Sequence, residues 1–421
     1  MRVLYLHQYF NTPKQEGGTR SYELARRLVE RGHEVHMITS RRDTEAKRGG
    51  WEESEIDGIR IHRIPVPYDN KMGAAGRIHA FLRFSVLASL KAMSFSDADV
   101  VFATSTPLTI VIPGWFASKR RRIPMVFEVR DLWPEIPIAV GALKNPWMIA
   151  AARRLEKIAY NNSFAVVALS PGMAEGVAAV GYPPERIFTI PNGCDRELFH
   201  VPAERGAAFR RAHPWLGDRP LVLYAGTIGH VNGLDYMVQL AEHVGKIDPE
   251  VRFLVVGTGR EEARIRRLAE ERGVLDRSFF MLPAVSKKEM PDLLSAATLA
   301  TSFVIDIPEM RHNSANKFFD AIAAGTPVAI NHEGWLADLI RRRELGLVMP
   351  AGEAQRAAGE LVGLLGDPAR LAAMSRAGVE ASKTLFDRDR LGAQLERVLR
   401  AAAERGNLPA PEELAEVAGE R

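Results

Sequence analysis

The chain has 421 residues, 46% of them hydrophobic, with a formal net charge of +4 and a pI near 9.1. At about 150 residues per domain, this length predicts two or three globular domains. The mild positive charge suits an anionic small molecule or an anionic membrane surface and gives no reason to expect nucleic acid. Cys194 is the only cysteine, which excludes an internal disulfide and a cysteine-based metal site and indicates a reducing cytoplasm.

The apolar segments are all short. The opening MRVLYLHQYF turns polar at His7, so we expect no signal peptide. No run reaches the about 18 apolar residues that a membrane-spanning helix needs. We therefore expect a cytoplasmic protein that is soluble or peripheral at the inner face of the cytoplasmic membrane.

The first half alternates strand and helix patterns. It begins with the apolar strand RVLYLHQYF, the glycine-rich loop NTPKQEGGTR, the amphipathic helix SYELARRLVERGHEV and the strand VHMITS. It continues through IRIHRIPV, helices near 76–94 and 107–120, and the segment PMVFEVRDLWPE. This βαβ alternation predicts a parallel sheet.

A second alternating set begins at PLVLYAGTIG and passes through VRFLVVGTGREEARI, FFMLPAV, LATSFV and PVAIN. Two consecutive sets predict an α/β protein with two doubly wound, Rossmann-like domains, 1–197 and 198–385. A helix is expected over 386–401, and the polar tail 402–421 is expected to be loose.

Two glycine loops follow the first strands of the two halves. Gly17 and Gly18 precede a helix expected to start near Thr19, and YAGTIGHVNG contains Gly226 and Gly229. Glycines let a backbone approach a ligand closely, and a helix N-terminus favours negative charge. A plain turn from strand to helix explains the first loop equally well.

The segment VVGTGREEARI contains Gly257 but lacks the third glycine of the dinucleotide fingerprint. NAD binding is therefore not expected, and the absence of a P-loop lysine motif argues against that type of ATP or GTP hydrolysis.

RHNSANKFFDAIAAGTP, which spans 311–327, is a loop rich in cations and amides that becomes a helix. A loop that leads into a helix N-terminus is a candidate anion site, here with Lys317 and Asp320 at its mouth.

Two other polar clusters carry candidate chemistry. FEVRDLWPEIP places Arg130 and Asp131 after a buried strand; an ordinary cap or turn is the alternative for Asp131. Asp387 and Asp389 form a D-x-D pair that can hold a divalent cation, but their position before a helix favours an N-cap.

The stretch 77–93 carries apolar residues near one helical face with basic residues among them. A core-facing helix is the ordinary interpretation, and a basic, apolar surface for an anionic membrane is the alternative.

The ordered set EGGTRSYELARRL, PNGCDRELF, YAGTIG, LVVGTG and NKFFDAIAAGTPVA resembles the family-4 glycosyltransferases, which have the GT-B fold and retain the anomeric configuration. The resemblance covers Arg2 to about Arg400. SANK and FEVRDLWPE look like the branch that builds bacterial surface polysaccharides such as O-antigen and capsule, including transferases of N-acetylfucosamine.

The resemblance implies a nucleoside-diphosphate sugar, expected to be UDP-linked, in a cleft between the two domains. It also implies a last helix that crosses back to the first domain, and a glycan or polyprenyl-diphosphate-linked acceptor. Asp131 falls near the family's polar catalytic position, and Asp320 falls on the carboxylate that usually holds the ribose. The donor-binding residues expected are Gly17, Gly18, Gly226, Thr227, Gly229, Gly257, Asn316, Lys317 and Asp320.

The chain departs from the family pattern in two places that affect function. His312 stands where the first acid of the acid–x7–acid motif is expected, and the basic pair after GTIG is missing. Lys317 is then the best cation for the diphosphate, with Arg311 as a second candidate. Arg130 and His312 are further candidate site residues without an assigned role.

We expect front-face substitution assisted by the leaving phosphate, with Lys317 and Asp131 as catalytic residues and with neither cofactor nor metal. Two alternatives remain open. One is a UDP-sugar 2-epimerase of the same architecture. The other is a non-catalytic nucleotide-sugar-binding protein, which stays open because His312 replaces an acid of the family motif. The donor sugar, the acceptor and the oligomeric state stay open.

Overall fold

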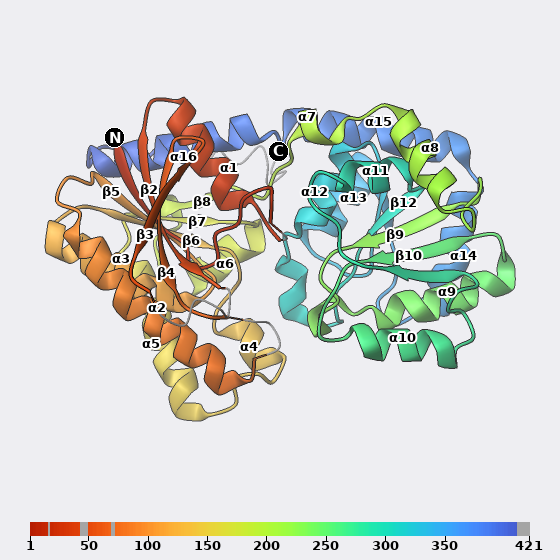
Figure 1. The fold of residues 1–421 in the computed structure, drawn as a ribbon, viewed down its shortest axis with the longest axis horizontal. Coiled ribbons are helices and arrows are strands. Elements are labelled where there is room, and N and C mark those ends of the chain that lie inside the picture. The colour runs from red at the N-terminus through yellow and green to blue at the C-terminus, as the bar shows by residue number, and fades with distance from the viewer. Residues whose placement is uncertain (16, 43–48, 69–71, 411–421) are drawn as a thin grey trace. The chain divides into compact units, whose positions relative to one another are not determined.

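Two separate sheets organise the chain (Figure 1). The computed structural model describes residues 1–15, 17–42, 49–68 and 72–410. The end of the predicted loose tail, residues 411–421, lies outside the described residues.

Contacts between residues divide the chain into two compact units. The first unit contains residues 1–12, 19–191 and the segment that begins at Arg388. The second unit contains residues 13–18 and 192–387. Each unit has its own mainly parallel sheet with helices on it, so the predicted class of two α/β domains is confirmed.

The first unit is built on an eight-stranded sheet in the order β3-β4-β2-β1-β5-β6-β7-β8. All neighbouring strands pair in parallel except β3 and β4. The strands are β1 Arg2–Leu6, β2 Glu34–Arg41, β3 Glu52–Ile56, β4 Ile59–Pro65, β5 Val100–Thr104, β6 Met125–Val129, β7 Ala165–Ala168 and β8 Ile187–Thr189.

Both faces of this sheet are buried, as the continuous apolar run of β1 requires. Successive side chains of a strand point to opposite faces, so Leu4 and Leu6 enter one core and Val3 and Tyr5 enter the other. The helices are α1 Arg20–Glu30, α2 Ala74–Ser94, α3 Val111–Arg121, α4 Glu135–Ala139, α5 Pro146–Asn161, α6 Pro171–Ala179 and α16 Arg388–Ala403, with short 3₁₀ helices at Leu108–Ile110 and η2 Pro184–Arg186.

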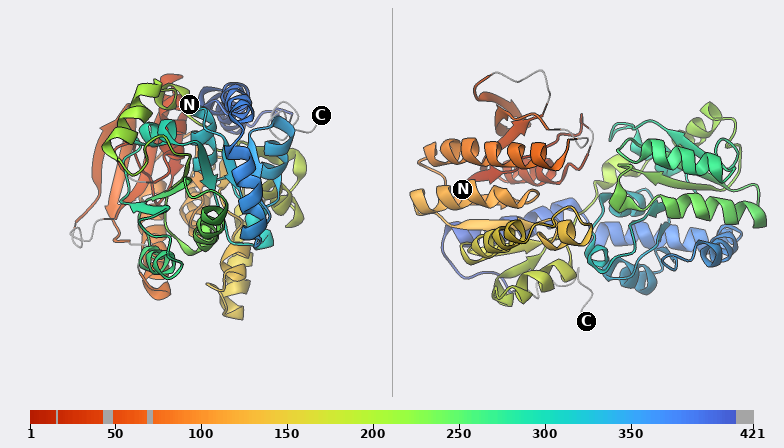
Figure 2. Two further views of the ribbon diagram at one scale, coloured as in Figure 1. Left: turned by 90° about the vertical axis from the view of Figure 1, so that its right-hand side faces the viewer. Right: turned by 90° about the horizontal axis from the view of Figure 1, so that it is seen from below.

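The helices of the first unit divide between the two faces. Side chains of α2, α3, α5 and α6 fill the core on one face, and these helices lie together in the view from below (Figure 2). Side chains of α1 and α16 fill the other core, where Leu391, Leu395, Val398 and Leu399 are at most 1% exposed. Leu408, beyond the end of α16, packs against the same core.

The second unit has a six-stranded, fully parallel sheet in the order β11-β10-β9-β12-β13-β14. Its strands are β9 Leu221–Ala225, β10 Arg252–Val256, β11 Phe279–Leu282, β12 Leu299–Ser302, β13 Val328–Ile330 and β14 Gly346–Val348. Its helices are α7 Arg196–Phe199, α8 Ala203–Ala212, α9 Asp235–Ile247, α10 Glu262–Glu271, α11 Met290–Ala296, α12 Asn316–Ala323, α13 Trp335–Arg343, α14 Ala354–Leu365 and α15 Pro368–Thr384, with 3₁₀ helices η3 His230–Asn232 and η4 Pro308–His312.

The strand order reverses direction between β9 and β12 in the second unit and between β1 and β5 in the first. In doubly wound sheets, ligands bind beyond the carboxyl ends of the strands at such a switch point. Most of the candidate site residues lie in the segments that follow β9 and β12 in the second unit and β1 and β6 in the first.

Candidate active site

Lys317, in the first turn of α12, reaches the loop that follows β9. Its Nζ donates to Tyr224 Oη at 3.1 Å and to Asn232 Oδ1 at 3.3 Å, and it lies 4.3 Å from the centroid of the Tyr224 ring. Tyr224 and Asn232 each donate to the backbone oxygen of Thr227, at 2.7 and 2.9 Å. These contacts join the start of α12 to the GTIG loop.

The partners of the Lys317 ammonium group are all neutral. No carboxylate of the described residues forms an ion pair with it, and loss of solvation lowers its pKa to about 8. A half-buried cation held by a ring, a hydroxyl and an amide keeps its charge available for an anionic ligand.

The two glycine loops of the second unit pack directly against each other. Gly226 N donates to Val256 O at 2.9 Å, and a Cβ at Gly257 would lie 1.9 Å from Gly226 O. Gly257 also has φ +156°, a conformation that other residues rarely adopt. Gly257 is thus required for packing, while Thr227 is exposed and Gly229 is half-buried beside it.

Polar groups at the start of α12 lack partners. The cap residue Ala315 has no side chain that can cap the helix, so the first backbone N–H groups are left without a side-chain acceptor. The buried Ser314 Oγ and Asn316 Oδ1 have no hydrogen-bond partner among the described residues. Asn192 Nδ2 donates to Ser314 O at 2.5 Å and holds this segment in place.

Asp320 lies one turn further along α12 and is only 7% exposed. Its Oδ2 forms an ion pair with Lys287 Nζ, which also lies 4.6 Å from the ring centroid of Phe199. Its Oδ1 is buried without a hydrogen-bond partner. Lys287 could not be predicted as a site residue, because nothing in VSKKEM marks it as the partner of a carboxylate 33 residues away.

The remaining candidates of the second unit come from η4 and from the segment 13–18. Arg311 is exposed and His312 is half-buried, both on η4. Gly17, with φ +109°, is exposed, and Gly18 is half-buried; both fall in the segment 13–18 that belongs to the second unit. The ribose and diphosphate roles of these residues stay predictions.

In the first unit, a buried ion pair lies beside the ends of β1, β5 and β6. Arg20 Nε and Nη2 donate to Glu128 Oε1 at 3.0 and 2.9 Å, and Thr104 Oγ1 donates to Glu128 Oε2. Arg20 also donates to the backbone oxygens of Ile190 and Pro191, at 2.8 and 2.5 Å. Because every group of the pair is satisfied, we assign it to holding the strand ends in register.

Asp131 is half-buried after β6, and burial raises its pKa to about 6, although the neighbouring Arg130 charge acts in the opposite direction. Arg130 donates from Nη1 to His7 Nε2 at 3.3 Å and from its backbone N–H to Ser105 Oγ at 3.0 Å. Burial, with the charges of Arg130 and a second arginine, holds the pKa of His7 well below its usual value, so His7 is neutral.

His7 is thus a candidate that sequence reasoning missed. The only signal was the point at which the first apolar strand turns polar.

Asp389, of the D-x-D pair, accepts a hydrogen bond from Arg27 Nε at 2.6 Å in the first unit. Within the described part of the chain, no group of three or more His, Cys, Asp or Glu residues could hold a metal ion. In the same part of the chain, no helix is both long and apolar enough to cross a membrane.

The comparisons with known proteins agree with this architecture. Residues 17–193 match the Glycosyl transferase 4-like domain, and residues 207–381 match Glycosyl transferases group 1. The D-inositol 3-phosphate glycosyltransferase of Xylanimonas cellulosilytica is 29% identical over 412 residues, which cover 92% of this chain and 93% of that protein.

Two solved structures show the same fold at low identity. Sucrose-phosphate synthase from Thermosynechococcus elongatus superposes with a TM-score of 0.78 at 18% identity, over 96% of this chain and 100% of that one. Anabaena HepE in complex with UDP-glucose gives 0.72 at 16% identity, over 95% and 100%. The chain therefore consists of a glycosyl transferase 4-like domain followed by a glycosyl transferases group 1 domain, and it is a glycosyltransferase of the GT-B fold.

Proposed function

We propose that the protein is a retaining glycosyltransferase that moves a sugar from a UDP-sugar to a hydroxyl group of a glycan acceptor. The Lys317 ammonium group carries this proposal, because it lies beyond the carboxyl end of β9 with neutral partners only. Beside it, Ser314 Oγ, Asn316 Oδ1 and the first amides of α12 offer further polar groups. A cation next to free N–H groups at a helix N-terminus suits a diphosphate.

In the proposed reaction, the bond between the sugar C1 and the UDP oxygen breaks. The acceptor oxygen bonds to C1 on the same face, and its proton passes to an oxygen of the departing diphosphate. Lys317 and the α12 amides stabilise the negative charge that develops on the diphosphate, and this step requires no metal.

Two carboxylates have proposed supporting roles. Asp320 Oδ1 would accept from the ribose, since its other oxygen is held by Lys287. Asp131 would orient the acceptor hydroxyl, and a pKa of about 6 leaves it mostly ionised at neutral pH.

The function is tested by donor binding followed by turnover. A thermal-shift screen with UDP-, GDP- and TDP-sugars identifies the donor, because a ligand at 100 times its Kd adds about 2.7 kcal/mol to the free energy of unfolding. We expect UDP-sugars to stabilise the protein and free UDP to appear only when an acceptor is present. A change of the UDP-sugar without acceptor would instead indicate a 2-epimerase, and tight binding without any turnover would indicate a nucleotide-sugar-binding protein.

For the acceptor we propose a polyprenyl-diphosphate-linked glycan used in surface polysaccharide synthesis, reached at an anionic membrane surface. The support is an exposed row on α2, here called the α2 stripe: Ile78, Leu82, Val86 and Leu90, which are 37%, 51%, 61% and 62% exposed. Residues four apart lie on one helical face. Helices α2, α3 and α5 together carry nine lysines and arginines and one glutamate, which complements anionic lipid.

Flotation with phosphatidylglycerol vesicles tests the membrane surface, with phosphatidylcholine vesicles for comparison. We expect binding to the anionic vesicles at low salt, and about tenfold weaker binding by Leu82→Ser/Val86→Ser, because each change removes a large apolar side chain from the stripe. The matched control Val231→Ser/Ile247→Ser alters exposed apolar residues of the second unit and should bind like the parent. Parent protein that stays with the soluble fraction would contradict the proposal.

The acceptor itself is tested by comparing UDP release with a polyprenyl-diphosphate-linked sugar and with D-inositol 3-phosphate, the substrate named for the relative from Xylanimonas cellulosilytica. Release with the inositol phosphate alone would overturn the lipid-linked acceptor while leaving the transferase proposal intact.

A further inference from the structure

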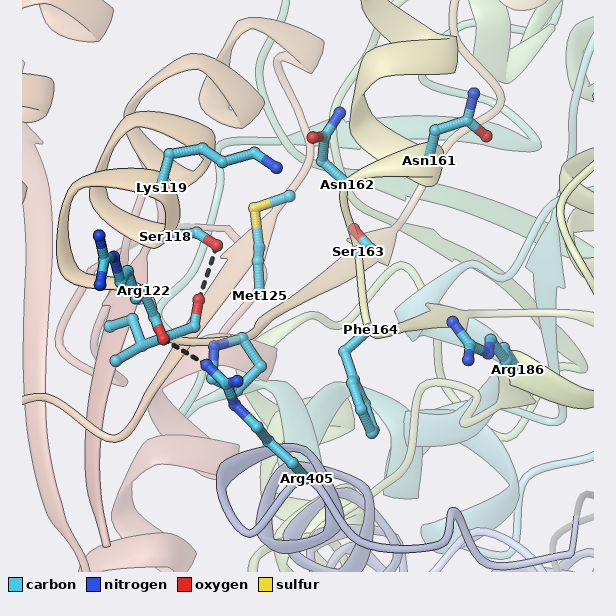
Figure 3. Close-up of a pocket in the computed structure, with 12 residues that line it drawn as sticks. Ser118, Lys119, Arg122, Met125, Asn161, Asn162, Ser163, Phe164, Arg186 and Arg405 are labelled. Atoms are coloured by element: carbon cyan, nitrogen blue, oxygen red, sulfur yellow. Dashed lines mark hydrogen bonds between the residues drawn. The ribbon is translucent and has the colours of Figure 1, made fainter.

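A basic pocket of about 500 Å³ lies at the amino-terminal edge of the sheet of the first unit (Figure 3). It is formed by the end of α3, the start of β6, the segment between α5 and β7, and two arginines from elsewhere in the chain. The lining residues are Ser118, Lys119, Arg122, Ile123, Pro124, Met125, Asn161, Asn162, Ser163, Phe164, Arg186 and Arg405. Its volume falls within the range of small-molecule sites.

Four of these residues are cations, and none is a carboxylate: Lys119, Arg122, Arg186 and Arg405. In the close-up, Lys119, Arg186 and Arg405 approach the pocket from three different sides (Figure 3). The C-terminal ends of α3, α5 and α16 lie at or next to this region, and each contributes about half a negative charge. The four cations carry a total charge of +4, which is larger than the partial negative charge of the three helix ends. The region is therefore positively charged overall.

The backbone conformation of two of the cations also indicates that their side chains have a function. Arg122, which caps α3, has φ +56°, and Arg405, just beyond α16, has φ +51°. Positions of this kind at helix ends favour glycine, because a side chain is strained there. Both helix ends carry an arginine instead, and Arg405 Nη2 donates to Arg122 O. Strained backbone positions of this kind are typical of residues whose side chains have a function.

Three of the four uncharged polar side chains of the pocket are already used by the fold, and the fourth, Asn161, is exposed. Ser118 Oγ donates to Ile123 O, Ser163 Oγ donates to Ala159 O, and Asn162 accepts from Trp115 and donates to Ile158 O. A neutral sugar, which needs many directional hydrogen bonds, would find few free partners here. The groups that remain are the four cations and Asn161, and the cations select an anion.

Two of the cations, Lys119 and Arg122, are exposed, and no ion pair holds either of them among the described residues. Arg186 stacks on the Phe164 ring, with its guanidinium carbon 5.9 Å from the ring centroid, which fixes its direction.

The pocket is separate from the candidate residues of the first unit. Met125 is the first residue of β6, whereas Arg130 and Asp131 follow its last residue. Five strand residues at about 3.3 Å each separate the two edges by about 16 Å. Ligands of the reaction are expected at the carboxyl edge, so an anion in this pocket would not be the sugar donor.

We propose that this pocket binds a phosphate group, either of a soluble phosphorylated effector or of an anionic lipid headgroup. The proposal does not rest on glycosyl transfer, because it concerns binding at the opposite edge of the sheet.

The variant that tests it is Arg122→Gly/Arg405→Gly. It removes two guanidinium groups and places glycine at two positive-φ positions, so the fold should be kept and relieved of strain. The control is Arg277→Ala/Arg343→Ala, which removes the same charge from exposed positions of the second unit. A cooperative melting transition in each of the three proteins establishes that they are folded.

Two probes distinguish the two sources of phosphate. Titration calorimetry with inorganic pyrophosphate, in saturating UDP so that the proposed diphosphate site at Lys317 is filled, reports the soluble source. Co-sedimentation with phosphatidylglycerol against phosphatidylcholine vesicles reports the lipid source. We expect the pocket variant to bind at least one probe tenfold or more weakly than the parent, and the control to bind both like the parent. A loss confined to pyrophosphate assigns a soluble ligand, and a loss confined to vesicles assigns a headgroup. Parent protein that binds neither probe, or a pocket variant that binds both unchanged, overturns the proposal.

Discussion

Lys317 shows how one side chain acquires its chemistry from its neighbours. Desolvation alone lowers its pKa to about 8, and the Tyr224 ring and the Asn232 amide hold the ammonium group without neutralising it. The charge of a lysine on an open surface would be solvated by water and screened by salt. Here the charge is placed at the switch point before any ligand arrives, which is the condition for stabilising a leaving group effectively.

We predict that Lys317→Ala lowers kcat about a hundredfold, because it removes one charge-assisted contact to the leaving diphosphate, worth about 3 kcal/mol. The pH profile gives a second readout. As the pH rises through about 8, Lys317 in the free enzyme loses its proton and its charge, so kcat/KM should fall on the alkaline side. Lys317→Arg keeps the charge and should abolish that fall. Steady-state UDP release between pH 6 and 9.5 measures both effects, and an unchanged kcat in the alanine variant would refute the role of Lys317.

At the scale of elements, the apolar runs of the sequence predict the strands and their parallel order well, because a strand buried on both faces leaves a clear pattern. Two ion pairs left no such pattern: Lys287 with Asp320, and Arg20 with Glu128. Their members are 33 and 108 residues apart, and only the packed sheets decide which distant charges meet. His7 was missed for a similar reason, since its partner Arg130 comes from a strand end more than a hundred residues later.

The glycine loops at the ends of β9 and β10 give a prediction at this scale. Gly257→Ala would drive a methyl group to 1.9 Å from Gly226 O and would push the GTIG loop out of place. We expect the KM for the donor to rise at least tenfold and the stability to fall by about 1–3 kcal/mol, as overpacked positions typically do. Gly245→Ala in α9 is the matched control, because its added Cβ meets nothing within 4 Å and alanine favours a helix. Equal donor KM values in the two variants would show that contact between the loops does not shape the site.

At the scale of the whole molecule, the first unit is completed by a helix from the far end of the chain. The apolar face of α16 packs into the same core as Val3 and Tyr5, and a Cβ at Gly392 would lie 3.1 Å from the Arg27 side chain of α1. Local sequence patterns predicted helix α16 but not the residues against which it packs. Its packing depends on a core assembled from segments more than 350 residues apart.

We predict that Leu395→Ala destabilises the first unit by about 2–5 kcal/mol, because it leaves a cavity at a fully buried position. For a domain of about 200 residues this corresponds to a fall in Tm of roughly 5–15 °C. Arg400→Ala, at an exposed position of the same helix whose ion pair with Glu396 is worth at most about 0.5 kcal/mol, serves as the control. Calorimetry should show a shift of one transition only; equal curves for the two variants would contradict the packing role of α16.

The position of α16 in the chain also sets an order of events during synthesis. The ribosome makes residues 388–403 after residues 192–387 of the second unit, so the face of the first sheet that carries Val3 and Tyr5 has the cover of α1 but not that of α16 while about 200 further residues are added. At 5–20 residues per second, this interval lasts roughly 10–40 s. The second unit, whose sheet is contained between 192 and 387, can reach its final fold first. The part of the protein that is translated first is thus the part that finishes folding last, and in that interval its open apolar face is a natural client for a chaperone.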